Sequence, residues 1–199
     1  MKKSVVLFVY LLLPAALIKA QDKPPKTYRN FPLVVTMQFH SLSFPFKNLK
    51  SNFSNAGLGL GTEIALGSEH NWAQQFNMIW YRNKYAGDGL GIYTQSSWRP
   101  TIAMNIYTET KIGFGAVYSF RPVESFKQRD GEWVSVGHQG KWMPIIPVGI
   151  SLGYNKSSTK TYVAPFISYQ LMLMGSYNKN APVMPNTLIQ VGTRIHFQK

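Results

Sequence analysis

Cysteine is absent from this chain of 199 residues. Without thiol groups the chain can form no disulfide bond, no thiolate metal site and no cysteine nucleophile. A lipid anchor attached to an N-terminal cysteine is not expected either. Noncovalent interactions must therefore stabilise the fold.

Beyond the N-terminal region, long apolar runs are also absent. A membrane-spanning helix needs about 20 predominantly apolar residues, and no later stretch reaches that length. Helical periodicity, with apolar residues recurring every three or four positions, is not sustained anywhere. Acidic residues are few, since 8 of them stand against 21 basic residues and the net charge is +13.

The first residues follow the order of a secretory signal peptide. Two lysines precede an apolar run from Val5 to Ile18, and Ala20 closes the segment before a polar, proline-containing stretch. The apolar run is short for a membrane span, as signal peptides require. We predict that residues 1–20 are the signal peptide; an uncleaved N-terminal helical anchor is the alternative. Because export separates the chain from nucleic acid, we expect no nucleic-acid partner.

Alternation of apolar and polar residues, which is typical of β-strands, recurs along the rest of the chain. Each stretch is long enough for the roughly 10 residues that a tilted transmembrane strand needs. The sequence therefore predicts an all-β fold, a single antiparallel transmembrane β-barrel of about eight strands. The stretches with this period are residues 31–40, 56–67, 71–82, 89–99, 109–120, 144–154, 162–173 and 188–199.

The two faces of the predicted strands differ in character. One face is apolar, whereas the other carries glycines, amides and a few charges, which fit the narrow interior of a small barrel. An apolar band bounded by aromatic residues is typical of a lipid-facing surface. We predict that the apolar face meets lipid; a soluble barrel with an apolar core is the alternative. The bounding aromatic residues are Trp72, Trp98, Tyr154 and Phe197 toward one end, and Trp80 and Phe120 toward the other.

The last strand resembles the C-terminal signal that the insertion machinery recognises in bacterial outer-membrane barrels. The residues that carry the resemblance are Gln190, Gly192, Ile195 and the aromatic Phe197. Together with the strand pattern, they make nearly the whole mature chain similar to the small outer-membrane β-barrel proteins. The resemblance implies a location in the outer membrane, contact with its lipid and lipopolysaccharide, and recognition by the barrel-insertion machinery. Residues 21–31 would be a periplasmic segment and residues 32–199 the barrel.

The search for catalytic and metal-binding motifs is negative. The glycines of "GLGLG" recur with the period of a strand and no helix follows, so a phosphate-binding loop is not indicated. Strand pairing is expected to place His40 near Gln190, roughly 20 Å from His196, while His70 and His138 lie in connections. We therefore predict no metal site and no cofactor.

One short segment resembles the region around the nucleophile of the lipid A 3-O-deacylases, which are also small outer-membrane barrels. Ser54 and Asn55 match the last two residues of their His-x-Ser-Asn motif, but Asn52 occupies the position of the general base. An amide cannot accept the serine proton. A deacylase-like enzyme is therefore only an alternative to a non-enzymatic barrel.

Five charged residues fall on the predicted inward face, and we expect them to interact inside the barrel. We expect Glu63 and Arg194 to pair across Thr36, and the other three charges to form a second group on the opposite wall. Because unpaired ions in such an interior are destabilising, these charges should compensate one another. A structural plug is the favoured interpretation, and a gate or narrow pore is the alternative. The charges are Glu63, Arg99, Glu109, Lys111 and Arg194.

The predicted outer loops carry aromatic and basic residues that could contact lipopolysaccharide or an envelope protein, although simple solvation would also account for them. These loop residues are Phe46, Lys47, Lys50, Phe126, Lys127, Arg129, Trp133, Lys141 and Trp142. The function that the sequence favours is a structural or accessory barrel of the envelope.

Overall fold

The computed structural model describes residues 31–42, 53, 55–66, 71–83, 87–120, 124, 126–137, 140–156, 161–177 and 182–197. The predicted signal peptide and nearly all of the periplasmic segment lie outside these residues, so the domain boundaries stay predictions. His70, His138 and the loop residues Phe46, Lys47 and Lys50 also lie outside them.

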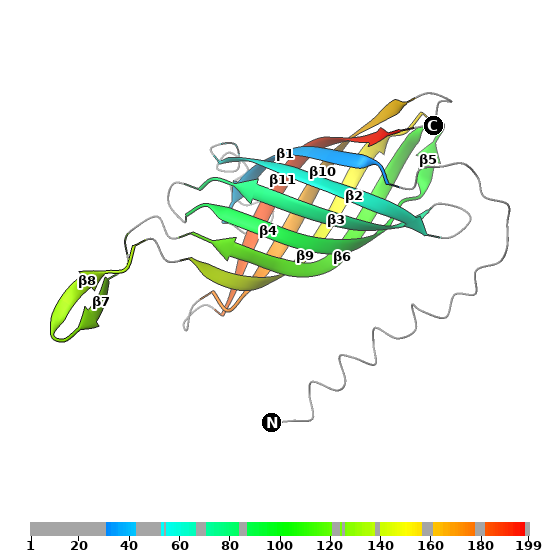
Figure 1. Ribbon diagram of the computed structural model, residues 1–199. Helices are drawn as coiled ribbons and strands as arrows, with labels where there is room; N and C mark the ends of the chain where they lie inside the picture. Colours follow the sequence, from blue (N-terminus) through cyan, green and yellow to red (C-terminus); the bar gives the residue numbers. More distant parts are fainter. Residues whose placement is uncertain are drawn as a thin grey trace.

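Eight long strands form a closed antiparallel barrel, as the alternation predicted (Figure 1). Each strand pairs with the next along the chain, and the last strand pairs with the first, which closes the sheet. The barrel strands are β1 (Leu33–Ser41), β2 (Ala56–Leu66), β3 (Trp72–Tyr81), β4 (Gly89–Trp98), β6 (Ile106–Ser119), β9 (Lys141–Tyr154), β10 (Tyr162–Gly175) and β11 (Val183–His196).

Among the described residues, no helix has the length and the apolar character needed to cross a membrane.

The prediction for the two faces of the sheet is confirmed. Ile112, Phe114 and Leu58 point outward and are about 60% exposed, at 61%, 61% and 60%. Their neighbours in sequence point inward, and Lys111 and Gly57 are buried. A soluble barrel would place the large apolar side chains inside, so this outward band is a lipid-facing surface.

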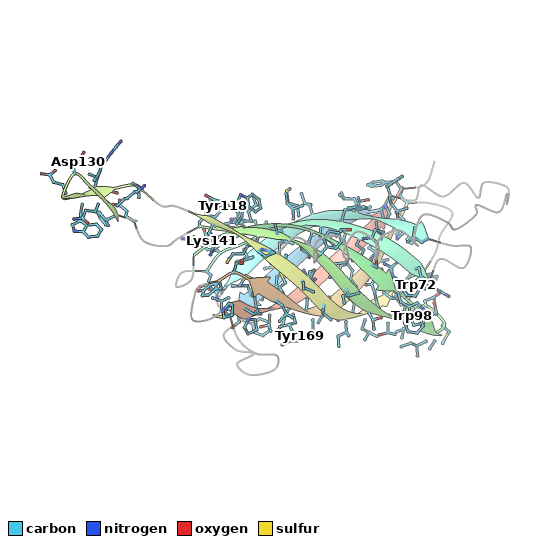
Figure 2. The ribbon with its side chains drawn as sticks, turned by 90° about the horizontal axis from the view of Figure 1, so that it is seen from below. Trp72, Trp98, Tyr118, Asp130, Lys141 and Tyr169 are labelled. Atoms are coloured by element: carbon cyan, nitrogen blue, oxygen red, sulfur yellow. The ribbon has the colours of Figure 1, made fainter. Side chains whose placement is uncertain are left out.

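Aromatic residues stand at both ends of this band. Trp72 and Trp98 are paired across β3 and β4 at one end, and both are exposed. Figure 2 shows them at the end opposite to Tyr118 and Lys141. Tyr118 contacts Trp142 at a ring-centroid distance of 5.3 Å. Lys141 and Trp142, predicted in an outer loop, instead begin β9, because the pairing of β6 with β9 continues to Ser119 and Lys141.

Three short strands were not predicted. β5 (Thr101–Ala103) folds back on the start of β6 through a turn in which Met104 has a φ of 36°. β7 (Phe126–Arg129) and β8 (Glu132–Ser135) form a separate hairpin within the connection between β6 and β9. Positive φ values at Asp130 (53°) and Gly131 (88°) give the two-residue turn that suits this hairpin. Figure 1 shows the hairpin standing away from the barrel.

The ends of the barrel differ in the length of their connections. The start of β1 and the end of β11 lie at one end, here called the terminal end, because Leu33 pairs with Ile195. Residues 67–71 and 155–161 make connections there. The longer connections, residues 42–55 and 120–140, lie at the opposite end, here called the loop end. Longer loops face outward in outer-membrane barrels, so we expect the loop end to be extracellular.

The loop half of the barrel interior contains an apolar core, beside buried polar residues such as His40, Asn83 and Asn186. Its members come from six strands and are almost fully buried, with exposures of 0% for Met172 and Leu188. Apolar side chains here occupy inward positions, opposite to the equally apolar lipid-facing band. The core residues are Ile79, Tyr81, Tyr93, Val117, Met143, Ile145, Met172, Met174 and Leu188.

Other inward positions are occupied by glycine where neighbouring strands approach closely. A Cβ on Gly113 would lie 1.9 Å from the carbonyl oxygen of Thr94, and one on Gly192 would lie 2.7 Å from Thr36 Cγ2. The first contact is with backbone and cannot relax by rotating a side chain. The sequence prediction that glycines serve the narrow interior is thus explained by close packing.

Candidate functional site: a charged network inside the barrel

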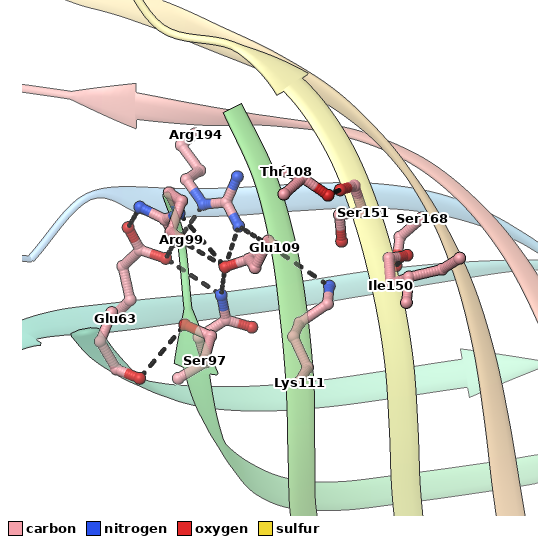
Figure 3. A network of polar contacts seen from close by, with 12 residues as sticks. Glu63, Ser97, Arg99, Thr108, Glu109, Lys111, Ile150, Ser151, Ser168 and Arg194 are labelled. Atoms are coloured by element: carbon pink, nitrogen blue, oxygen red, sulfur yellow. Dashed lines mark hydrogen bonds and ion pairs between the residues drawn. The ribbon is translucent and has the colours of Figure 1, made fainter. Parts of the chain in front are cut away.

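Five charged side chains meet in the interior near the terminal end. Glu63 comes from β2, Glu109 and Lys111 from β6, and Arg194 from β11, while Arg99 directly follows β4. Their positions all fall on the inward alternation of the strands. Glu109, Arg194, Glu63 and Lys111 are buried, with exposures of 0%, 2%, 4% and 5%. Figure 3 shows the side chains converging from different walls.

Arg194 connects the two carboxylates. Its Nε lies 3.0 Å from Glu63 Oε2. Its Nη2 donates to both oxygens of Glu109, at 2.8 Å to Oε2 and 3.1 Å to Oε1. Nη1 donates to the hydroxyl of Tyr107. The planar guanidinium therefore has charged or polar partners on all sides, the arrangement for which arginine is better suited than lysine.

Arg99 contacts the same two carboxylates from another direction. Nη1 and Nη2 donate to the two oxygens of Glu63, at 2.9 and 2.6 Å. Nε and Nη2 donate to Glu109 Oε1, at 3.2 and 2.8 Å. Each carboxylate is thus held between two guanidinium groups. Charge-assisted bonds of this kind are the strong class of protein hydrogen bonds.

Gln75 and Lys111 complete the network. The Gln75 amide donates to Glu63 Oε2 at 3.2 Å and to Glu109 Oε1 at 2.8 Å. Lys111 Nζ is more distant, 3.8 Å from Glu109 Oε2, and lies 5.6 Å from the ring centroid of Phe166. Three cations and two anions leave one positive charge in excess. Lys111 is the least tightly bound of the three cations.

An apolar cluster of Val34, Tyr107 and Phe166 adjoins the charges. Arg194 Cζ lies 4.3 Å from the Phe166 ring centroid, and Arg99 Cζ lies 5.3 Å from that of Tyr107. Aromatic faces therefore cover the parts of the guanidinium groups that face no carboxylate. Such contacts stabilise desolvated cations.

The predicted partners Glu63 and Arg194 are in contact, but the predicted register is wrong. Thr36 pairs with Gly59 on one side and with Gly192 on the other, and Arg194 faces Val34. Both charged residues lie nearer the terminal end than expected, because β1 pairs with β2 and with β11 in other registers: Arg194 lies opposite Val34, and Glu63 lies one residue beyond Thr62, the partner of Leu33. Both shifts are toward the terminal end, so the two side chains still meet in the interior.

The predicted second group on the opposite wall is also wrong. Arg99 binds Glu63 as well as Glu109, and Arg194 binds both. The interior of an eight-stranded barrel is narrow enough for long side chains to cross it. One network therefore forms where two were expected.

Sequence reasoning missed three members of this site. Gln75 lies at an inward position of the predicted strand 71–82, but its contact with two carboxylates from other strands was not predicted. Tyr107 and Phe166 were not assigned to the site, because Tyr107 falls between the predicted strands 89–99 and 109–120 and the aromatic residues were expected to bound the lipid-facing band. The inward position of Phe166, two residues from the inward Ser168, was the available signal.

The residues of the predicted C-terminal signal occupy ordinary barrel positions. Gln190 points inward and donates to Gln38 Oε1 at 3.1 Å. Ile195 is half-buried, and Phe197 follows the end of β11 with 39% exposure. Their recognition by insertion machinery stays a prediction.

The histidine positions differ from the expected ones. His40 pairs with Leu188, not with Gln190, since Gln190 faces Gln38. The His40 ring stacks on Tyr81 at 4.1 Å, and its Nδ1 lies 3.3 Å from Asn83 Nδ2. Within the described part of the chain, no three His, Asp or Glu residues are grouped so that they could bind a metal ion.

The segment that resembles the deacylase motif is only partly described. Asn52 and Ser54 lie outside the described residues. The Asn55 amide donates to the backbone carbonyl of His40 at 3.1 Å.

Comparison with known proteins gives the fold. No protein family and no curated protein matches the sequence. Neisserial surface protein A aligns with a TM-score of 0.60 over 86% of this chain and 100% of its own, at 9% identity. The N-terminal β-barrel domain of Pseudomonas aeruginosa OprF gives 0.52 over 83% and 97%, at 8% identity. Ail, the attachment invasion locus protein of Yersinia pestis, gives 0.50 over 84% and 97%, at 13% identity.

These similarities confirm the fold of the small outer-membrane β-barrels. At such low identities they carry no information on function. Together with the exposed apolar band and its aromatic ends, the fold makes the chain an integral protein of the outer membrane.

The network predicts different effects for its anions and its excess cation. Replacing Glu109 by Gln removes the partner of three cations in a buried position, so the free energy of unfolding should fall by about 3–5 kcal/mol. Replacing Lys111 by Met removes the weakest contact and the excess charge, so the loss should be about 1 kcal/mol or less. Urea unfolding in lipid vesicles measures both values. Equal losses for the two variants would contradict the assignment of Lys111 as the excess cation.

Proposed function

We propose that the protein is a closed, non-enzymatic barrel that acts as a structural or accessory component of the outer membrane. The observation that supports this function is the filling of the interior. The charged network occupies the terminal half, and nine apolar or aromatic side chains occupy the loop half. Between them, buried amides such as Gln38 and Gln190 bond to each other. Such an interior favours a plug over a gate or a narrow pore.

An enzymatic function has less support. The hypothesis of a lipid A deacylase depends on Ser54 with Asn52 in the position of its base. An amide at that position cannot activate the serine.

The projecting hairpin is the surface that we propose for an envelope protein partner. All its strand residues are exposed, among them Trp133 at 70%, Phe126 at 57% and Val134 at 47%. Among the described residues, no strand pairs with the outer edges of β7 and β8. An isolated two-stranded hairpin is marginally stable in water, and unpaired edges favour the addition of a partner strand. A protein partner would supply both an apolar contact and an edge.

Conductance distinguishes a plug from a pore. The purified barrel in planar bilayers should show no stable single-channel steps. The double variant Arg99→Ala with Arg194→Ala should be equally silent, provided that it folds, because the apolar core still closes the loop half. A stable step in the unmodified protein would support the narrow pore instead. A step in the double variant alone would make the network a gate.

Photo-crosslinking tests the partner surface. A photoreactive amino acid at Trp133 should crosslink to a protein in intact cells, whereas the same group at Trp72, in the lipid-facing band at the other end, should not. When residues 126–135 are replaced by a short glycine turn, the barrel should still fold. A photoreactive group placed just outside the replaced segment should then give no protein crosslinks. Crosslinks from position 133 to lipid alone would contradict an accessory role.

The barrel-insertion machinery is the second partner that we propose, through Gln190, Gly192, Ile195 and Phe197. Phe197→Ala should lower the amount of assembled protein several-fold, measured as the band that migrates differently when the sample is not heated. Phe120→Ala is the matched control, since Phe120 is a similarly exposed aromatic residue, 38% against 39%, at the other end of the lipid-facing band. Equal assembly of the two variants would count against a C-terminal signal.

A further inference from the structure

The lipid-facing surface of β1, β2 and β3 contains a groove near the loop end. It has a volume of about 600 Å³. Met37, Leu58 and Trp80 form its apolar walls, Ala56 and Gly57 form its floor, and the polar Asn55 also lines it. The wall residues are exposed at 49%, 60% and 43%, so the groove opens toward the membrane.

The groove exists because a small residue stands where its neighbours are large. Ala56 points outward at the start of β2 and places only a methyl group between larger side chains. The next residue, Gly57, occupies an inward position and contributes only its backbone to the groove. The resulting hollow is apolar over most of its length, as an acyl chain requires.

Among the described residues, one cation lines the groove, at its loop-end rim. Arg82 follows β3, and its backbone N–H donates to the carbonyl of Ala56 at 3.1 Å, which fixes it beside the floor. Its side chain is exposed, and within the described ranges no carboxylate forms an ion pair with it. Asp88, in the same connection, instead accepts a hydrogen bond from the backbone N–H of Asn83 at 3.1 Å.

The height of Arg82 identifies the leaflet. It lies two residues beyond Trp80, one of the aromatic residues at the extracellular border of the lipid-facing band. An arginine at that level meets the headgroup region of the outer leaflet, while the groove below it meets acyl chains. A guanidinium group matches phosphate in charge and in its bidentate geometry.

We propose that this groove is a binding site for the lipid A part of lipopolysaccharide, with an acyl chain over Ala56 and Gly57 and a phosphate on Arg82. Lipid A carries phosphate on an acylated sugar in the outer leaflet, and therefore combines the two features of the groove at the right depth. The site is independent of the closed interior and of the projecting hairpin, so it stands or falls separately from the proposed function.

Two variants test the two parts of the site. Arg82→Ala removes the phosphate contact, and Ala56→Leu fills the floor of the groove. Both residues face outward, so folding should be preserved, as the shifted band of the unheated sample verifies. Arg129→Ala, an exposed arginine on the hairpin, and Ala116→Leu, an outward alanine on β6, are the matched controls.

Native mass spectrometry of the full-length barrel, titrated with purified lipid A, gives the apparent affinities. Arg82→Ala and Ala56→Leu should each weaken binding about tenfold or more, which corresponds to the loss of one well-formed contact. Arg82→Lys should retain part of the affinity, and the two controls should bind like the unmodified protein. Lipid A without phosphates should bind the unmodified protein as weakly as lipid A binds the Arg82→Ala variant.

Three results would overturn the proposal. The first is equal lipid A affinity for the unmodified protein, Arg82→Ala and Ala56→Leu. The second is equally tight binding of phosphatidylglycerol, which would make the groove a general phospholipid contact. The third is a dimer that Ala56→Leu dissociates, which would assign the groove to a second copy of the chain.

Discussion

The closed ladder of backbone hydrogen bonds is the constraint on which the rest of this structure depends. In hydrocarbon every backbone N–H and C=O must be paired within the protein, and a sheet satisfies this only when it has no open edge. The pairing of β1 with β11, from Leu33 with Ile195 to Ser41 with Thr187, removes that edge. Once the sheet is closed, each strand side chain must point either outward to the lipid or inward to the barrel interior.

The charged network follows from that choice. The inward charges near the terminal end are almost fully shielded from water, with side-chain exposures between 0% and 13%, so their partners are other inward side chains. The contributing residues are far apart in sequence, and Glu63 and Arg194 are separated by 131 positions. Their contacts therefore link β2, β4, β6 and β11 across the interior. The network adds cross-barrel contacts to a fold whose backbone bonds join only neighbouring strands.

The sequence predicted the barrel well because alternation carries most of the information. Leu58 and Gly59, or Ile112 and Lys111, differ so strongly in polarity that their faces could be assigned without coordinates. The same rule is silent where both faces are apolar. Ile79 and Trp80 are adjacent and both hydrophobic, yet one is buried in the core and the other is exposed to lipid. The apolar core of the loop half therefore could not be recognised as such.

Contacts between strands were harder to predict than faces. The register of two paired strands depends on where the connection between them begins and ends. The sequence of residues 42–55 did not show that β1 ends at Ser41. Errors in register do not alter which side chains point inward, so the members of the network were identified while their grouping was not. The hairpin of β7 and β8 was missed because its four-residue strands are too short for alternation to be distinctive.

Because the interior is filled by the protein's own side chains, the lipid-facing surface and the projecting hairpin are the described parts that other molecules can contact. The lipid-facing band is there because the bilayer requires it, and most of its large side chains need no further explanation. A departure from this uniform surface is therefore more informative than the surface itself. The groove over Ala56, bordered by Trp80 and Arg82, is such a departure. The small Ala56 side chain leaves less apolar surface there than a large residue would, and the charged Arg82 side chain lies at the edge of the lipid-facing band. The interior side chains of this barrel contact one another and stabilise the fold. Local differences in residue size and charge on the outside can therefore allow one small barrel to bind a molecule that another does not bind.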